Sequence, residues 1–146
     1  MDAAPEESNV DSAKQAEQQW HDAHYKSHAE SVHPPALEDF RRLFVQGQLA
    51  PFCEGGRSWW GDARKEALDT AGDVRGLRVL DYGCGFGSLG LYLSQCGAQV
   101  WGFDLSGTAV DAANDAARRY GLSTQFAQMD AEHLRYDSDF FDLMIG

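Results

Sequence analysis

The sequence predicts an α/β protein with a parallel sheet and flanking helices in three layers. From residue 76 onward, short apolar runs alternate with segments of helical periodicity, which is typical of βαβ units. In the stretch 77–90, LRVLDYGCGFGSLG, one such run passes through a glycine-rich loop into a helix. Asp81, Asp104 and Asp130 close the first three runs, and ligands of parallel sheets bind beyond the carboxyl ends of the strands. These observations indicate a Rossmann-like arrangement with a ligand site at that edge.

Composition limits the function classes. The chain has 146 residues, 43% of them hydrophobic, which suits one globular domain. A net charge of −11 disfavours nucleic acid as a partner. The apolar runs are shorter than the roughly 20 residues that a membrane-spanning helix needs. The N-terminus is acidic, whereas a signal peptide would be basic and then apolar. The cysteines Cys53, Cys84 and Cys96 form no CxxC pair. We therefore expect reduced thiols and a cytoplasmic location.

The chain divides into three parts. Residues 1–11 are polar and expected to be a disordered tail. Residues 12–75 are expected to form an N-terminal helical cap, and residues 76–146 the sheet domain. Within the cap we expect helices at about 11–30, 36–46 and 62–70, with an irregular aromatic stretch at 48–61 that could cover a pocket.

Three histidines of the first helix, His21, His24 and His28, have helical spacing. Such spacing is compatible with a metal site. No carboxylate-and-histidine signature such as HExxH accompanies them, so a solvated polar face is favoured and no metal is expected.

The sheet domain is expected to contain four strands, with helices after the first and second. The strands are expected at 77–80, 99–103, 123–129 and 140–145. Ser106 is a favourable N-cap for the second helix, and Gly121 a favourable end. The sheet-facing side of that helix is expected to carry Val110, Ala113, Ala117 and Tyr120.

The aspartates at the strand ends help to distinguish a dinucleotide cofactor from a cationic nucleoside. A literal GxGxxG occurs at Gly85, Gly87 and Gly90, but it starts four residues beyond the strand end. Asp81 at the tip of the first strand would repel a pyrophosphate and attract an ammonium group. Asp104 suits two ribose hydroxyls. A cationic nucleoside is therefore favoured over a dinucleotide.

The segments 79–106 (VLDYGCGFGSLGLYLSQCGAQVWGFDLS) and 129–146 (MDAEHLRYDSDFFDLMIG) resemble class I S-adenosylmethionine-dependent methyltransferases. The family's loop reads D/E-x-G-x-G-x-G. The resemblance implies that S-adenosylmethionine is the cofactor. Asp81 would organise its methionine ammonium group through water, Gly83, Cys84 and Gly85 would form the loop against it, and Gly87 would open the next helix.

At the nucleoside end, the resemblance implies that Asp104 holds the ribose hydroxyls and that Leu105 lies against the adenine. Asp130 would accept from the adenine amino group, and Ala131 would lie on the ring. The N-terminal helices, with Trp20 and Tyr25, resemble the variable cap that small-molecule methyltransferases place over the acceptor.

Members of this family continue beyond the fourth strand, whereas this chain stops at Gly146, so we expect a truncated sequence or one completed by a partner. Tyr82 and His133 are candidates for polar contacts, but no catalytic acid or base is assigned. Three functions stay open: a small-molecule methyltransferase, a non-catalytic S-adenosylmethionine-binding or interaction module, and, least favoured, an NAD-dependent oxidoreductase. The apolar run at 140–146 would lie on an open sheet edge, so self-association through it is also expected.

Overall fold

The computed structural model describes residues 7–28, 66 and 69–146, and the side chains of residues 12–27 within the first range. The expected helix at 36–46, the aromatic stretch at 48–61, Cys53 and most of the expected helix at 62–70 lie outside these residues. The side chain of His28, one of the three helically spaced histidines, also lies outside the described side chains.

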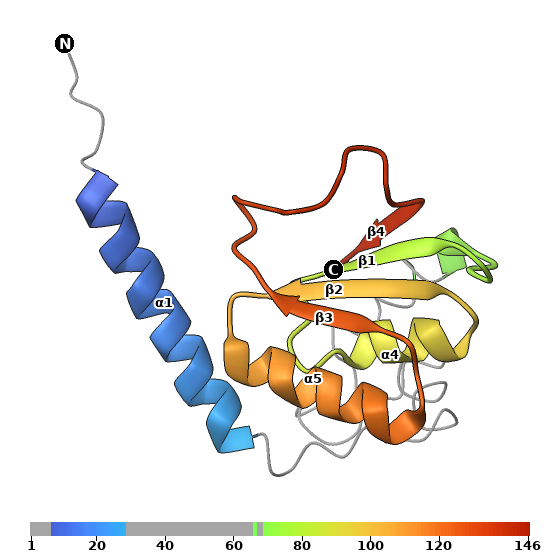
Figure 1. Ribbon diagram of the computed structural model, residues 1–146, viewed down its shortest axis with the longest axis horizontal. Coiled ribbons are helices and arrows are strands. Elements are labelled where there is room, and N and C mark those ends of the chain that lie inside the picture. Colours follow the sequence, from blue (N-terminus) through green and yellow to red (C-terminus); the bar gives the residue numbers. More distant parts are fainter. Residues whose placement is uncertain (1–6, 29–65, 67–68) are drawn as a thin grey trace.

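A parallel sheet of four strands organises the described residues (Figure 1). The strands are β1 (Arg78–Tyr82), β2 (Gln99–Asp104), β3 (Gln125–Gln128) and β4 (Leu143–Ile145), in the order β3-β2-β1-β4. All three neighbouring pairs are parallel, and Asp81 lies opposite Gly102 of β2 and Ile145 of β4. The predicted α/β class with a parallel sheet is confirmed.

Two helices cover one face of this sheet (Figure 1). Helix α4 (Ser88–Gln95) follows β1 and packs on it through Leu89 and Leu93, which share a buried cluster with Val79 and Val100. Helix α5 (Gly107–Tyr120) follows β2 and packs through small side chains around Phe126 of β3. The βαβ units expected from the alternating pattern are therefore present.

Helix α5 has the ends that its sequence predicts. The Ser106 side chain accepts from the backbone N–H of Ala109, and Gly121 ends the helix in the left-handed conformation with φ of 63°. Val110 and Ala113 are buried as expected. Tyr120 is 39% exposed, so its predicted sheet-facing position is wrong: it is the last residue of α5, and the buried face of the helix ends at Ala117.

The opposite face of the sheet is covered by an aromatic loop rather than by a helix within the described residues. Phe141 and Tyr136, from the segment between β3 and β4, pack beside a buried cluster that contains Leu80 and Phe103. The Phe140 and Phe141 rings both lie edge-on to Trp101, at centroid distances of 5.0 and 5.8 Å.

The fourth strand is shorter than expected. It begins at Leu143, so the expected start at Phe140 is wrong: the two phenylalanines pack on Trp101 of β2 and do not extend the ladder beside β1. Among the described residues the strand forms an edge of the sheet, and Met144 is 61% exposed there. The sequence predicts that this run is buried on both faces of the sheet. Ile145 is buried, but Met144 is exposed, so the prediction is wrong for Met144.

Helix α1 (Glu7–His28) runs along the side of the sheet where the strands end (Figure 1). It begins at Glu7, so the expectation of disorder for residues 7–11 is wrong. The segment ESNVD carries two acidic residues, which favours the N-terminal turns of a helix. The described helices include none that is long and apolar enough to cross a membrane.

Candidate functional site

A pocket of about 410 Å³ lies at the carboxyl ends of the strands, between them and α1. Five of the nine predicted cofactor residues line it: Gly83, Asp104, Leu105, Asp130 and Ala131. They come from the three loops that follow β1, β2 and β3. The parallel sheet thus brings together residues that are up to 48 positions apart in the sequence.

Asp104 is both a lining residue and an anchor for two of these loops. It is 7% exposed. Its Oδ2 accepts from the Gly85 N–H and its Oδ1 from the Ser106 N–H, each at 2.9 Å. Each carboxylate oxygen can accept a second hydrogen bond, so Asp104 can still bind two hydroxyl groups of a ligand.

Asp81 lies beneath the glycine loop rather than on the pocket wall. It is 3% exposed, and its Oδ2 accepts from the Gly90 N–H of α4 at 2.9 Å. This carboxylate therefore satisfies one of the free N–H groups in the first turn of α4. Its predicted link to a methionine ammonium group through water stays a prediction.

The other loop residues also lie outside the pocket lining. Gly87 is the N-cap of α4, as predicted, with φ of 73°. A Cβ on Gly85 would lie 3.1 Å from the Tyr25 hydroxyl, so this glycine leaves room for α1. Burial, together with Asp81 and Asp104, raises the pKa of the Cys84 thiol, which keeps it protonated.

Helix α1 supplies the wall that faces the sheet. The lining residues Lys14, Glu17, His21 and Tyr25 recur at i, i+3, i+7 and i+11, so they share one face of the helix. Trp20, which was expected near the acceptor, is exposed and stacks on His24 at a centroid distance of 5.4 Å.

Two further contacts attach α1 to the pocket loops. Asp22 accepts from the Ser106 hydroxyl and from the Thr108 N–H, the latter at 3.3 Å, and the Ser106 bond lowers the pKa of this carboxyl group. The Tyr25 ring lies edge-on to Phe86 of the glycine loop at 4.8 Å. Burial raises the pKa of Tyr25, and the charge of Asp104 adds to this effect.

Asp130 is held by donors from two elements. Lys14 Nζ donates to its Oδ2 at 2.6 Å, and the Glu132 N–H donates to its Oδ1 at 2.9 Å. Lys14 also bonds the Glu132 carboxylate. These bonds lower the pKa of Asp130 to about 2 and raise that of Lys14 to about 12, so both are charged near neutral pH.

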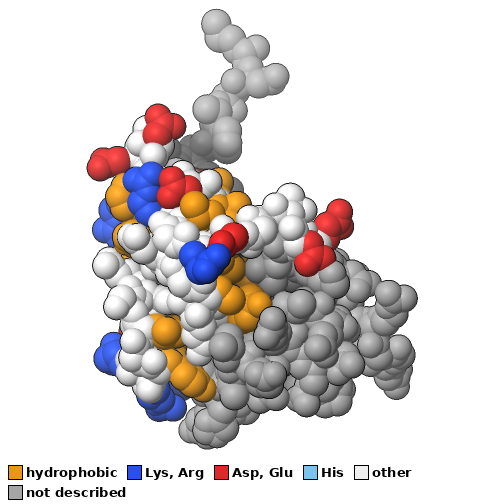
Figure 2. Space-filling view, turned by 90° about the vertical axis from the view of Figure 1, so that its right-hand side faces the viewer, with side chains coloured by type: hydrophobic (Ala, Val, Ile, Leu, Met, Phe, Trp, Pro, Cys, Tyr) orange, Lys and Arg blue, Asp and Glu red, His pale blue; other side chains and the backbone are white. Residues whose placement is uncertain are grey.

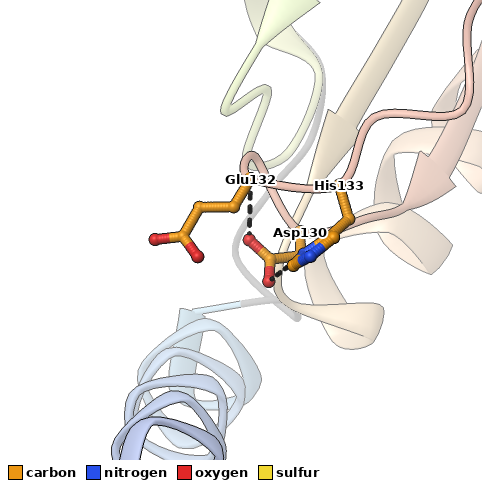
Figure 3. A group of neighbouring side chains, drawn as sticks. All are labelled: Asp130, Glu132 and His133. Carbon is orange, nitrogen blue, oxygen red and sulfur yellow. Dashed lines mark hydrogen bonds and ion pairs between the residues drawn. The ribbon is translucent and has the colours of Figure 1, made fainter. Parts of the chain in front are cut away.

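Asp130, Glu132 and His133 form a group whose possible ligand atoms lie within 4.8 Å of one another. Figure 3 shows them on the turn after β3, with Asp130 joined to the backbone of Glu132 and to the His133 ring. The ammonium group of Lys14 already bonds both carboxylates. This arrangement is that of an ion-pair cluster, and nothing in it requires a metal.

The sequence pattern missed the contributions of Lys14 and Glu17, although their helical spacing with His21 was visible. Of the two candidates for polar contacts, Tyr82 lines the pocket and packs edge-on against Phe103 at 4.8 Å. His133 reaches Asp130 at 3.4 Å from the exposed side of the turn.

Comparison with known proteins identifies the sheet domain. Residues 79–146 match the family model described as a methyltransferase domain. The ubiquinone biosynthesis O-methyltransferase of Coxiella burnetii is 30% identical over 109 residues, which cover 66% of this chain and 47% of that protein. The chain thus spans about half the length of the curated relatives it matches.

Two solved structures share the fold. The YcgJ protein from Bacillus subtilis is 31% identical, with a TM-score of 0.51 over 54% of this chain and 34% of its own. The [4+2]-cyclase SpnF is 29% identical, with a TM-score of 0.50 over 74% of this chain and 44% of its own.

Residues 79–146 therefore form a class I S-adenosylmethionine-dependent methyltransferase domain. The cofactor of this class is S-adenosylmethionine, and the pocket is chemically suited to it. Asp104 and Asp130 place carboxylates in its lining, and Leu105 and Ala131 add apolar side chains beside them. A Cβ on Gly83 would meet nothing within 4 Å, so backbone is open to a ligand there.

Proposed function

We propose that this chain binds S-adenosylmethionine in the pocket between α1 and the strand ends, and that the protein transfers its methyl group to a small molecule. The observation that carries the proposal is the meeting of Gly83, Asp104 and Asp130, from three separate loops, in one pocket of about 410 Å³. A tight strand-to-helix turn explains the glycines alone, but it does not explain carboxylates on the next two loops.

The residues of this chain are proposed to bind and orient. Asp104 would hold the ribose hydroxyls, and its bonds to Gly85 and Ser106 fix the carboxylate before the ligand arrives. Leu105 and Ala131 would contact the adenine, and Asp130 would accept from its amino group. Asp81 would act on the methionine end through water. When bound, the cofactor supplies a sulfonium methyl group for in-line displacement, so the contribution of the protein is positioning and exclusion of water.

A small hydroxyl-bearing acceptor is favoured by the relatives, which are named as O-methyltransferases of ubiquinone biosynthesis. The α1 face with His21 and Tyr25 would provide the acceptor side of the pocket. A cytoplasmic location and the absence of a nucleic-acid partner stay predictions. On the face shown in Figure 2, basic side chains are scattered among acidic ones and do not form one patch.

Calorimetric titration with S-adenosylhomocysteine, the demethylated product, tests the binding step. Asp104→Asn should weaken binding by about 1.5–3 kcal/mol, the range for hydrogen bonds to a charged group. Asp111→Asn is the matched control, because this exposed side chain lies on α5 away from the pocket lining. Thermal melting of both variants separates lost binding from lost folding. Equal affinity of the two variants would remove Asp104 from the site.

A non-catalytic or differently catalytic S-adenosylmethionine-binding protein is the second candidate. One structural neighbour is named as a [4+2]-cyclase, and a fold does not determine a reaction. Incubation with S-adenosylmethionine carrying a tritiated methyl group and a mixture of small phenols distinguishes the two. Binding without any label transfer favours the second candidate.

A further inference from the structure

Lys14 already bonds the carboxylate that the adenine amino group of a nucleoside would need. Its Nζ lies 2.6 Å from Asp130 Oδ2, and both residues line the pocket. Under the proposed function, Asp130 accepts a hydrogen bond from the adenine amino group. The Asp130 carboxylate therefore has two alternative partners, the Lys14 ammonium group of the chain itself and the amino group of the cofactor.

We propose that Lys14 is an internal competitor of the cofactor, whose ammonium group holds Asp130 in the empty pocket and releases it when the adenine amino group binds. This inference rests on the proposed function. It assigns to an α1 residue the control of affinity at the nucleoside end of the pocket.

Lys14 contacts the Asp130 carboxylate at the pocket, because both residues line it. Its Oδ1 accepts from the Glu132 N–H at 2.9 Å, and its Oδ2 faces both Lys14 and the His133 ring nitrogen, the latter at 3.4 Å. A carboxylate has about four lone pairs, so the number of neighbours alone excludes no further donor. The competition is for space on the pocket side of Oδ2, where the Lys14 ammonium group already lies and where the adenine amino group would enter.

Lys14 stays near Asp130 because α1 is attached at two other loops. Asp22 bonds Ser106 and Thr108 at the start of α5, and Tyr25 packs on Phe86. Lys14 and Tyr25 are eleven positions apart, or about 16 Å at the rise of an α-helix. The helix therefore spans the pocket from the glycine loop to Asp130.

Glu132 lowers the free-energy cost of replacing Lys14 by the adenine amino group at Asp130. It bonds Lys14 from the exposed side of the turn, so Lys14 keeps a carboxylate partner after it leaves Asp130. The exchange then loses one partly exposed ion pair, while the Lys14 ammonium group keeps the Glu132 carboxylate as its counter-charge. Such pairs are weak, so the competition should lower cofactor affinity by about two- to five-fold.

Titration with S-adenosylhomocysteine, followed by calorimetry at 50 mM and 500 mM NaCl, tests the inference. Lys14→Met should bind about two- to five-fold more tightly than the wild type at low salt. Lys26→Met removes the same charge from an exposed position of the same helix and should bind like the wild type. High salt weakens exposed ion pairs, so it should tighten binding to the wild type more than to Lys14→Met.

Glu132→Gln provides an independent variant. It leaves Lys14 with Asp130 as its described carboxylate partner, so it should weaken binding. Unchanged or weaker binding by Lys14→Met would overturn the inference while leaving the proposed function intact. No binding by the wild-type chain would overturn both.

Discussion

Gly87→Ala tests the geometry that opens the glycine loop into α4. Gly87 has φ of 73°, and a Cβ there would lie 2.8 Å from the Phe126 ring and 2.9 Å from Ala113 Cβ. A left-handed conformation costs a non-glycine residue about 1–2 kcal/mol. Overpacking of a core costs about 1–3 kcal/mol more, so we expect a loss of about 2–5 kcal/mol in the free energy of unfolding.

Gly121→Ala is the matched control. Gly121 has φ of 63°, but a Cβ there would meet nothing within 4 Å, so it should cost about 1–2 kcal/mol from the backbone alone. Urea unfolding followed by circular dichroism measures both variants. Equal losses at the two positions would refute the packing of Gly87 against Phe126 and Ala113.

Three other predictions concern the sheet edge and α1. The Arg78 bonds lower the pKa of Asp142 to about 2, so their contribution to stability is complete above the ordinary pKa of 3.8 and is lost as the pH falls toward 2; Asp142→Asn should flatten the pH dependence of urea unfolding in that window. Met144→Lys should reduce self-association through the edge of β4, and light scattering that shows the same particle size for this variant and the wild type would contradict this role. Asp22→Ala should lose the bond to Ser106 and weaken the attachment of α1, which hydrogen exchange would report as faster exchange in α1, while unchanged protection would contradict that role.

The sheet side of the pocket could be predicted because its signals are local. An apolar run followed by a glycine loop, and an N-cap serine after the second run, determine where each strand ends. Once the strands are parallel, Asp104 and Asp130 must meet at one edge. The family resemblance then indicated that the ligand is S-adenosylmethionine.

The α1 side of the pocket could not be predicted in the same way. The Lys14–Asp130 pair joins residues 116 positions apart, and helical spacing shows which residues share a face without showing what that face contacts. The length of β4 was missed for a related reason. Phe140 and Phe141 look like strand residues, but their contact with Trp101 removes them from the ladder.

Two-dimensional NMR of the ¹⁵N-labelled chain, titrated with S-adenosylhomocysteine, tests directly whether the three strand-end loops form one cofactor pocket. Saturable shifts should appear together at the backbone amides of Gly83, Leu105 and Ala131. The amide of Asp111 on the exposed side of α5 should stay in place. Absence of saturable shifts, or shifts confined to one of the three loops, would contradict the assignment of this pocket to S-adenosylmethionine.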